Sequence, residues 1–485
     1  MSATELDFDS CYRAVAARDA RFDGRFYTAV TTTRIYCRPV CPARTPTSRN
    51  VRFYRHAASA EAAGFRPCKR CRPELSPGDP GWDHRGDLVG RALRLIDEGV
   101  ADDGGITRLA GRLHITERHL HRLFAGELGV GPLAVVRTKR LLLAKQLLTE
   151  TGLPISDVAF AAGFGSVRQF NATMKETYGF TPGELRATAG RAASGNALTL
   201  RLHRREPYDA GTLMRFLAAR AIPGLEQADE TSYRRAVPQG TITLTPLPGH
   251  VRLDVTLDDT RHLARVVARA RRLLDLDADP ESISGALGET ALAPLVAARP
   301  GLRVPGAWDG FEAAVRAVIG QQISVAGART ILGRLTARVG RTAGLVTAGA
   351  GGADGGCVGG DGPHLLFPTA ADLAGADVTA LAGLGLTGRR VTTLRALAEK
   401  VAGGEIDLDG AQEPAEAVAR LLEVPGIGPW TAGYIALRAL RDPDAWPRGD
   451  LGLRRAMACL GIPDDHIERW RPWRAYAALH LWSSE

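Results

Sequence analysis

Residues 31–74 read TTTRIYCRPVCPARTPTSRNVRFYRHAASAEAAGFRPCKRCRPE. This stretch contains four of the chain's seven cysteines, spaced as C-x3-C, then 26 residues, then C-x2-C. Two close pairs of cysteines separated by a longer loop are typical of a tetrahedral zinc site, and spacing alone favours a purely structural role for it. The spacing therefore predicts one zinc ion bound by Cys37, Cys41, Cys68 and Cys71.

The composition limits what the rest of the chain can be. Its 485 residues suggest three or four domains of about 150 residues each, and a hydrophobic content of 45% is that of a globular protein. A formal net charge of +9 suits a polyanionic partner but does not require one. The N-terminal residues lack the features of a signal peptide, and no run of about 18 apolar residues occurs, so we expect a cytoplasmic protein without a membrane span. Thiols stay reduced there, which favours metal over disulfides.

Changes in composition divide the chain. Residues 74–87 are rich in Pro and Gly, residues 186–198 are rich in small side chains, and both are interpreted as linkers. Residues 344–364 are rich in Gly and Ala between two helical patterns, which indicates a mobile loop inside a domain. The predicted fold class is a multidomain, mainly helical chain with α+β parts. Its predicted domains are a small zinc-binding domain (1–78), a tandem helix-turn-helix domain (84–188), a small mixed α/β domain (197–303) and an all-helical domain (304–485).

An internal repeat lies between the two linkers. The segment ITRLAGRLHITERHLHRLFAGELGVGP (106–132) recurs as ISDVAFAAGFGSVRQFNATMKETYGFTP (155–182). Each copy has a short helix, a tight turn and a Thr or Ser cap before a longer amphipathic helix, so each predicts a helix-turn-helix unit. The longer helices, 116–128 and 166–178, are the predicted readers of a DNA major groove. Their side chains that could reach bases or phosphates are Arg118, His119, Arg122, Arg168, Gln169 and Asn171.

A second DNA-binding pattern lies near the C-terminus. Residues 421–440 read LLEVPGIGPWTAGYIALRAL and predict a helix, a Gly-rich hairpin and a second helix. Gly426 and Gly428 permit a sharp turn, and Pro429 suits the first turn of a helix. The N–H groups of such a hairpin can bind a DNA phosphate without reading its sequence. Asp450 follows Trp430 by twenty residues, at the start of a further predicted helix where Asp is a good N-cap.

Residues 5–188, with the cysteine motif and the helix-turn-helix repeat, resemble the N-terminal half of the Ada adaptive-response family. The resemblance implies that the zinc cluster is a reagent, in which Cys37 takes a methyl group irreversibly from a methylphosphotriester in DNA. Four thiolates on Zn²⁺ carry a formal charge of −2, and methylating one leaves −1, so repulsion from DNA phosphate falls and operator affinity can rise. The expected phosphate contacts are the flanking Arg34, Arg38, Arg44, Lys69, Arg70 and Arg72.

Residues 198–482 resemble the helix-hairpin-helix DNA glycosylases of the 3-methyladenine DNA glycosylase II (AlkA) type, through segments such as RPGLRVPGAWDGFEAAVRAVIGQQISVAGA and RWRPWRAYAALHLW. The resemblance implies cleavage of the glycosidic bond of alkylated purines such as 3-methyladenine, with Asp450 as the carboxylate that stabilises a cationic sugar. It implies a base-binding cleft of Trp430, Tyr434 and Trp482, whose ring faces would attract a base made cationic by alkylation. The implied DNA contacts are Gln321, Gln322, Gly426 and Gly428, with Gln322 where the family places an apolar wedge.

Three features narrow the expected activity. Trp430 stands where some family members carry a Lys nucleophile, so we expect a monofunctional glycosylase without strand nicking. No closely spaced four-cysteine run follows the hairpin, so no iron–sulfur cluster is expected. Besides zinc, the one other candidate cofactor is a monovalent cation at the hairpin. The Pro-Cys-His-Arg motif of the Ada alkyltransferase domain does not occur in this sequence, so no repair of O6-alkylguanine is assigned.

The leading hypothesis is a methylation-sensing transcription activator fused to an alkylbase glycosylase. Such a protein would act as a monomer on double-stranded DNA at damaged sites and promoters, near the nucleoid and together with RNA polymerase. Two alternatives stay open. One is a glycosylase whose zinc and helix-turn-helix modules only tether it to DNA, and the other is a DNA-binding regulator with a non-catalytic glycosylase half.

Overall fold

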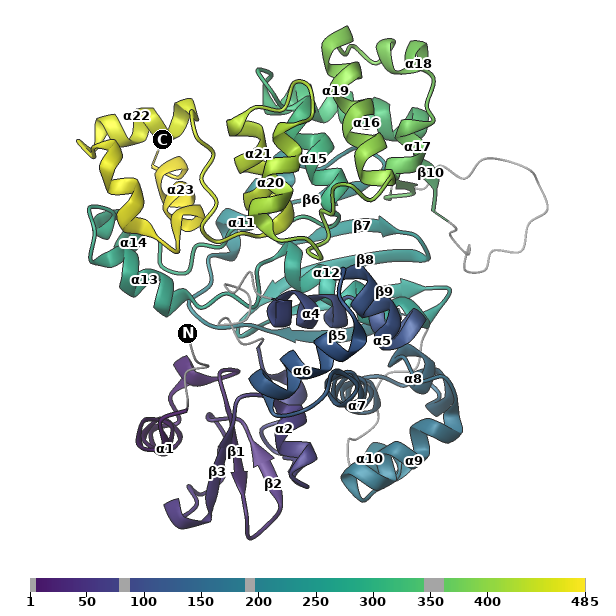
Figure 1. Ribbon diagram of the computed structural model, residues 1–485, viewed down its shortest axis with the longest axis vertical. Helices are drawn as coiled ribbons and strands as arrows, with labels where there is room; N and C mark the ends of the chain where they lie inside the picture. Colours follow the sequence, from purple (N-terminus) through teal and green to yellow (C-terminus); the bar gives the residue numbers. More distant parts are fainter. Residues whose placement is uncertain (1–5, 78–87, 188–196, 344–361, 485) are drawn as a thin grey trace, which may run out of the picture.

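The computed structural model describes residues 6–77, 88–187, 197–343 and 362–484. It confirms a multidomain, mainly helical protein with small sheets. In Figure 1 the N-terminal half forms the lower part of the molecule and the C-terminal helices form the upper part. Among the described residues, no helix is both long and apolar enough to cross a membrane.

The first module is a small sheet flanked by two helices, α1 (Phe8–Ala17) and α2 (Ala57–Ala62). Its strand order is β3-β1-β2-β4, and β2 and β4 run parallel while the other pairs are antiparallel. The strands are short, and buried Tyr36 and Phe65 supply the largest side chains of its core. The strand bounds are β1 Tyr27–Val30, β2 Ile35–Cys37, β3 Val51–Tyr54 and β4 Arg66–Pro67.

Within the described residues 88–187, seven helices form the tandem helix-turn-helix module, and both predicted long helices are confirmed. Thr116 caps the first through the N–H of His119, and Ser166 caps the second through the N–H of Gln169. Both helices end at a glycine with positive φ, Gly129 at 71° and Gly179 at 75°. The helices are α4 Leu88–Asp97, α5 Val100–Arg112, α6 Glu117–Leu128, α7 Pro132–Glu150, α8 Ile155–Ala161, α9 Val167–Tyr178 and α10 Pro182–Ala187.

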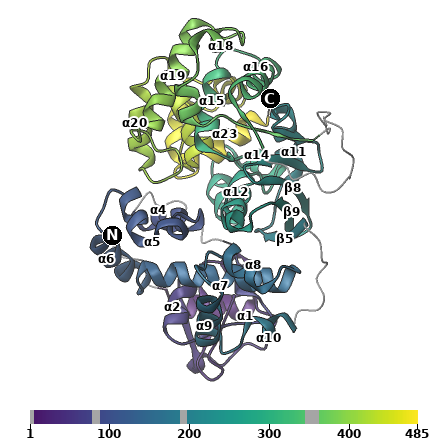
Figure 2. The ribbon, with the colours of Figure 1, turned by 90° about the vertical axis from the view of Figure 1, so that its right-hand side faces the viewer.

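A buried polar cluster joins the first module to this one. Glu61 of α2 accepts hydrogen bonds from the Tyr36 hydroxyl at 3.0 Å, from the Tyr178 hydroxyl at 3.1 Å and from Thr138 of α7 at 2.5 Å. Burial raises the pKa of Glu61 above its ordinary value, although these three donors oppose the shift. Lys145 of α7, 1% exposed, donates to the carbonyl of Cys68. Helix α7, which lies between the two helix-turn-helix units in the chain, therefore holds them and the cysteine-rich module together (Figure 2).

The third module is an antiparallel five-stranded sheet of order β5-β9-β8-β7-β6. Alternate residues of β5 and β9 face each other across the ladder, as in the pair Leu200 and Leu253, and both are 0% exposed. This sheet shares one hydrophobic core with the second helix-turn-helix unit. The elements are β5 Ala197–His203, α11 Ala210–Arg220, β6 Glu226–Ala228, β7 Tyr233–Val237, β8 Gly240–Leu247, β9 His250–Leu257 and α12 Leu263–Leu273.

The remaining chain is almost entirely helical, as predicted. Helix α15 (Gly310–Ile319) is buried on all sides and forms the centre of one core. A second core lies under α22 and α23. The other elements are α13 Pro280–Gly288, α14 Ala293–Ala298, α16 Val325–Val339, β10 Arg341–Thr342, β11 Leu365–Leu366, α17 Ala370–Ala374, α18 Val378–Ala382, α19 Gly388–Ala402, α20 Pro414–Leu422, α21 Pro429–Ile435, the π-helical turn Ala436–Leu440, α22 Leu451–Cys459 and α23 Arg474–Trp482.

The structure tests only part of the two predicted linkers and of the predicted Gly/Ala-rich loop. The linker prediction is wrong at Glu74, whose buried carboxylate pairs with Lys145 at 2.6 Å and with Arg72 at 3.0 Å. Residues 78–87, 188–196 and 344–361, on which most of these predictions fall, lie outside the described residues. The strands β10 and β11 on either side of the Gly/Ala-rich segment pair with each other, so that segment connects two strands of one domain.

Charged contacts join the N-terminal half to the C-terminal half. Arg25 of the first module pairs with Asp279 at the start of α13, Arg112 of α5 pairs with Asp407 at 2.6 Å, and Arg272 of α12 pairs with Glu98. Ala411, from the C-terminal half, packs into the core of the first helix-turn-helix unit. Every module therefore contributes side chains to the contact between the two halves.

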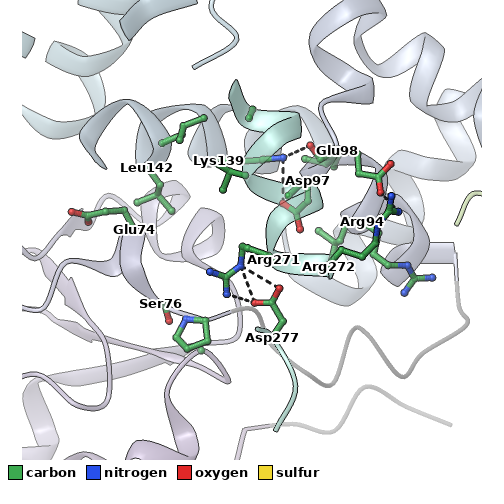
Figure 3. Close-up of a pocket in the computed structure, with 18 of the residues that line it drawn as sticks. Glu74, Ser76, Arg94, Asp97, Glu98, Lys139, Leu142, Arg271, Arg272 and Asp277 are labelled. Carbon is green, nitrogen blue, oxygen red and sulfur yellow. Dashed lines mark hydrogen bonds and ion pairs between the residues drawn. The ribbon is translucent and has the colours of Figure 1, made fainter. Parts of the chain in front are cut away.

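A cavity of about 340 Å³ lies at this junction. Its charged side chains largely neutralise one another, as Arg271 does with Asp277 and Lys139 with Asp97 in Figure 3. None of the predicted site residues is among its described lining residues. The cavity belongs to the contact between the halves and is separate from both predicted reactive centres.

Candidate functional site

The parallel pairing of two strands brings the four cysteines together. Strand β2 ends at Cys37, and Tyr36 lies opposite Pro67 of β4, so Cys68 follows at the same end of the sheet. The N–H of Cys68 donates to the carbonyl of Tyr36 at 2.9 Å. The Sγ atoms of the four cysteines all lie within 4.8 Å of one another. Four sulfur ligands at this separation fit a single tetrahedral zinc ion.

The four sulfurs differ in exposure and in hydrogen bonding. Cys68 and Cys71 are each 7% exposed, whereas Cys37 and Cys41 are only partly buried. Backbone N–H groups donate to Cys68 Sγ at 3.4 Å and to Cys71 Sγ at 3.3 Å, and Cys41 also receives one. Within the described part of the chain, Cys37 Sγ has no such donor. Such N–H donors draw negative charge from a thiolate, so the four sulfurs are not equivalent in their surroundings.

Two of the six basic residues predicted to contact phosphate are engaged inside the protein. The guanidinium of Arg38 pairs with Asp23 and donates to the carbonyl of Cys71 at 3.1 Å. Arg72 pairs with Glu74 and Glu150, each at 3.0 Å. Arg34, Arg44, Lys69 and Arg70 are exposed, although Arg34 lies over the ring of Phe65 and Lys69 over that of Phe180. Arg38 and Arg72 are therefore held by carboxylates in this structure, and a phosphate-binding role for them stays a prediction.

A cavity of about 500 Å³ in the C-terminal half contains Asp450 and the three predicted aromatic residues. Asp450 is the N-cap of α22 and accepts the N–H of Leu453 at 2.9 Å, as predicted. Gly449 before it has φ of +84°, a turn that few other residues adopt. The indole N–H of Trp430 donates to Asp450 Oδ2 at 2.7 Å, and that of Trp482 donates to Oδ1 at 2.9 Å. Three N–H donors thus orient the carboxylate.

The aromatic residues form one continuous wall of this cavity. The rings of Trp430 and Tyr434 stack with their centroids 5.5 Å apart and 14° between their planes. The ring of Trp482 stands edge-on to Tyr434 at 6.3 Å. Burial alone would raise the pKa of Tyr434, but the guanidinium groups of Arg438 and Arg220 outweigh it, and that pKa lies below its ordinary value.

The predicted hairpin connects α20 to α21, with Gly426 at its tip. Gly426 has φ of +88°, and a side chain there would lie 2.2 Å from Thr393 Oγ1, so the position requires glycine. Gly428 is the N-cap of α21 and has open space around it. Gln321 donates to the carbonyl of Gly426 at 3.1 Å and to Thr431 at 2.8 Å. Gln321 therefore holds the hairpin against α15 in this structure, with its amide turned inward.

Gln322 differs from its neighbour in exposure and conformation. It is exposed, and its φ of +53° is a strained conformation for a residue with a side chain. Such strain is often stored at binding sites. Gln322 is not itself among the lining residues of the cavity, but Gly320 and Ile323, close to it in the sequence, are.

The helix-turn-helix residues lie on the surface. His119 is half-buried, and its Nδ1 accepts a hydrogen bond from Arg122 at 3.1 Å, whereas the other predicted contacts are exposed: Arg118, Arg122, Arg168, Gln169 and Asn171. The opposite faces of α6 and α9 are buried through Phe124 and Phe170. The two helices thus offer polar faces to solvent on either side of α7.

Sequence reasoning missed two features of the cavity. One is the pair of indole N–H groups that hold Asp450, because nothing in the sequence indicates the direction of a ring nitrogen. The other is the pair of arginines, Arg220 and Arg438, that line the cavity beside Tyr434. The spacing of Tyr434 and Arg438, four residues apart on one helix, could have indicated their contact. Arg220 comes from another domain and has no such local indication.

Family models match the chain in four consecutive segments. They are described as the metal binding domain of Ada (residues 10–74), a helix-turn-helix domain (109–188), the AlkA N-terminal domain (199–309) and the HhH-GPD superfamily of base excision DNA repair proteins (315–470). The order and type of the four predicted domains agree with these matches, whereas their exact boundaries stay predictions.

Three curated proteins are similar to parts or all of the chain. DNA-3-methyladenine glycosylase 2 of Escherichia coli (strain K12) is 35% identical over 58% of this chain and 95% of its own length. The bifunctional transcriptional activator/DNA repair enzyme Ada of the same organism is 37% identical over 38% of this chain and 50% of its length. The probable bifunctional transcriptional activator/DNA repair enzyme AlkA of Mycobacterium tuberculosis (strain ATCC 25618 / H37Rv) is 45% identical over 99% of this chain and 96% of its length. The chain therefore belongs to the family of the bifunctional transcriptional activator/DNA repair enzyme AlkA.

Proposed function

We propose that this protein both repairs alkylated DNA and reports alkylation to transcription. Its C-terminal half releases alkylated purines such as 3-methyladenine as a monofunctional DNA glycosylase. Its N-terminal half moves a methyl group from a DNA methylphosphotriester onto Cys37 and then activates transcription at specific promoters. The observation that carries the proposal is the Asp450 carboxylate, held by two indoles and one backbone N–H inside an aromatic cavity next to the hairpin.

The arrangement suits cleavage of a glycosidic bond. As the base leaves, positive charge develops on the sugar, and the oriented carboxylate of Asp450 stabilises it without reorganising. The rings of Trp430, Tyr434 and Trp482 provide stacking surfaces for an extruded base. The carboxylate can also direct a water molecule to the sugar carbon. Trp430 has no amine with which to form a Schiff base, so the product is an abasic site in an intact strand.

Backbone groups and Gln322 would hold the DNA. The N–H groups of the hairpin between α20 and α21 suit a phosphate downstream of the extruded base. Gln322, exposed and close in sequence to lining residues of the cavity, suits the space that the base leaves in the duplex. Gln321 acts indirectly by fixing Gly426 in the hairpin. A monovalent cation at the hairpin carbonyls stays a prediction.

The cysteine cluster suits methyl transfer. Its four sulfurs fit zinc, which when bound there keeps them ionised at neutral pH. Cys37 Sγ attacks the methyl carbon of the phosphotriester, a sulfur–carbon bond forms as the carbon–oxygen bond breaks, and the oxygen leaves as the phosphodiester anion. The partial exposure of Cys37 and its lack of an N–H donor in the described residues favour it over Cys68 and Cys71.

Methylation of Cys37 removes one negative charge from the DNA-facing module, which strengthens binding to an operator. Arg118, Arg122, Arg168 and Gln169, exposed on α6 and α9, are the proposed contacts with bases and phosphates. Double-stranded DNA is thus the principal partner, with RNA polymerase at the promoter, and the protein acts as a monomer in the bacterial cytoplasm, near the nucleoid.

A single sample can test both activities. The protein is mixed with DNA treated with a methylating agent, base release is followed under single-turnover conditions, and the intact mass of the protein is measured. Asp450→Asn should lower release by about 10²–10³-fold while binding in a gel shift persists, because Asn still caps α22. Cys37→Ala should abolish the mass increase of one methyl group. Release by a folded Asp450→Asn protein at the wild-type rate contradicts the glycosylase proposal.

A further inference from the structure

A short turn between α15 and α16 is fixed at both ends. Gly320 closes α15, and its N–H donates to the carbonyl of Arg316 at 2.9 Å. Ser324 caps α16 by accepting the N–H of Gly327 at 3.1 Å. Gln322 lies between these ends, is exposed and has φ of +53°. Because a left-handed conformation is unfavourable for a residue with a side chain, neighbouring contacts have to hold it there.

Gln321, the residue before it, is held through both its side chain and its backbone. The side-chain amide donates to the carbonyl of Gly426 at 3.1 Å and to Thr431 Oγ1 at 2.8 Å. The backbone carbonyl accepts a hydrogen bond from the guanidinium of Arg390. That carbonyl belongs to the planar peptide group that joins Gln321 to Gln322, so rotation of this group changes φ of Gln322. Arg390 therefore restrains the left-handed conformation of Gln322 directly.

One face of α19 contacts both this turn and the hairpin. Thr387 caps the helix by accepting the N–H of Arg390, which places Arg390 in the first helical turn. Thr393 lies three positions later, on the same face. A side chain at Gly426 of the hairpin would lie 2.2 Å from Thr393 Oγ1, so helix and hairpin are in close contact there. The turn with Gln322 and the hairpin are thus both fixed to one helix.

The guanidinium of Arg390 serves this turn and no carboxylate. It is partly buried, and within the described part of the chain it forms no ion pair. Arg38, by contrast, is fixed by pairing with Asp23. A hydrogen bond from a charged donor is stronger than one from a neutral donor, so the bond from Arg390 can offset the cost of the left-handed conformation of Gln322.

We propose that Arg390 is a positioning residue for extrusion of the target base. By holding the carbonyl of Gln321, it keeps Gln322 in the conformation in which its side chain enters the duplex. The same contact keeps Gln322 at a fixed position relative to the hairpin that binds the phosphate. Arg390 takes no part in the bond cleavage at Asp450. This inference rests on the proposed glycosylase function.

Two DNA duplexes of equal sequence test the proposal. In one, 7-methylguanine is paired with cytosine, and in the other it lies in a single-nucleotide bulge, where extrusion costs less because no partner base holds it. Single-turnover release rates at saturating protein are measured for full-length wild type, Arg390→Met, Arg390→Lys and Arg389→Met. Arg389 is the exposed neighbour of Arg390 on α19, so Arg389→Met is a control that removes the same charge.

Arg390→Met should slow release from the paired duplex by about tenfold, because the peptide group before Gln322 can then turn to a relaxed conformation. Release from the bulge should fall by less than about threefold, since that base needs little help to leave the stack. Arg390→Lys keeps a charged donor for the single carbonyl, so it should recover most of the rate. Arg389→Met should leave the ratio of paired to bulged release at its wild-type value.

The Gln322→Gly background tests whether Arg390 acts through Gln322. Glycine adopts positive φ without strain and has no side chain to insert, so nothing remains there for Arg390 to position. Adding Arg390→Met to Gln322→Gly should therefore slow release from the paired duplex by less than about twofold further. A further loss of about tenfold would mean that Arg390 acts elsewhere, and would overturn the proposal.

Equal losses on both duplexes in Arg390→Met would overturn it as well, because Arg390 would then support the fold or bind DNA in general. A fall of about one in the slope of log Kd against log salt concentration would identify Arg390 as such a phosphate contact. Should Arg390→Met fail to fold, Arg390→Gln, which lacks the charge, is judged by the same ratio. Absence of release from both duplexes by wild type would instead reject the proposed glycosylase function.

Discussion

Beside the cysteine cluster, Arg38 and Arg72 are paired with carboxylates that are at most 8% exposed, whereas in the base cavity Arg220 and Arg438 have no carboxylate partner among the described residues. The two centres therefore use the same residue type differently. At the cluster, paired arginine fixes the turns that present the cysteines. In the cavity, unpaired arginine stays available to a ligand.

The number of basic residues in a stretch of sequence does not give the net charge of the site that they form. The cysteine-rich stretch is visibly basic, yet part of that charge is neutralised by Asp23, Glu74 and Glu150. The stretch of sequence around the base cavity is not visibly basic, yet Arg220 and Arg438, which line the cavity, have no carboxylate partner among the described residues. Local field depends on which carboxylates fold against each arginine, and counting basic residues along the chain does not reveal it.

Removal of zinc should produce the largest contrast between the two centres. Structural zinc sites contribute about 10–16 kcal/mol of apparent binding free energy, so a strong chelator should unfold the cysteine-rich module. The base cavity contains no predicted metal ligand, and base release should persist. Limited proteolysis, methyl acceptance and base release are measured before and after chelation. An unchanged cleavage pattern in residues 6–77 would contradict the metal-dependent half of the comparison.

Breaking one paired arginine should have the next largest effect. Arg38→Gln leaves Asp23, which is 6% exposed, without its ion-pair partner, and should lower the free energy of unfolding by about 3–5 kcal/mol. Arg70→Gln, an exposed neighbour, should change it by less than about 0.5 kcal/mol. Urea unfolding of both zinc-loaded variants distinguishes the pair. Similar free energies of unfolding for the two variants would show that the ion pair between Arg38 and Asp23 does not stabilise the fold.

The indole donors to Asp450 can be removed one at a time. Trp430→Phe and Trp482→Phe keep an aromatic ring but lose the N–H at 2.7 Å and 2.9 Å, respectively. Each should slow single-turnover base release by about tenfold, the value of one hydrogen bond to a charged group. DNA binding measured in parallel should be less affected. A rate unaffected in both variants would remove these indoles from the positioning of the carboxylate.

The smallest effect is a loss of stability in acid. Burial, with Arg299 in addition, lowers the pKa of His480 to about 4 from its ordinary 6.5. The unfolded chain therefore takes up a proton that the folded chain excludes, and stability present above pH 6.5 is lost as pH falls toward 4. Between pH 7.0 and 5.5, protonation of His480 in the unfolded chain should lower the free energy of unfolding by about 1 kcal/mol. Urea unfolding of wild type and His480→Gln should show a weaker pH dependence in the variant, and equal dependence would exclude His480.

Much of the fold could be predicted because the residues that start and end its helices lie next to those helices in the sequence. Thr116 and Ser166 mark the helix starts, and Gly129 and Gly179 mark their ends, within a turn of the residues they cap. The hairpin glycine Gly426 is likewise recognisable from its immediate neighbours. The linker interpretation failed at Glu74 because its partner Lys145 lies 71 residues away.

By itself the sequence determined the cysteine spacing, the helix-turn-helix repeat, the hairpin and the position of Asp450 after it. Each is a pattern of side-chain type or backbone freedom over a short segment, where sterics and capping act directly. Tertiary structure decided which arginines are neutralised, how Trp430 and Trp482 hold Asp450, and how Arg220 comes to lie beside Tyr434. Those contacts join residues that are distant along the chain, as with the 174 positions between Glu98 and Arg272, and only the packing of complete domains brings them within hydrogen-bond range.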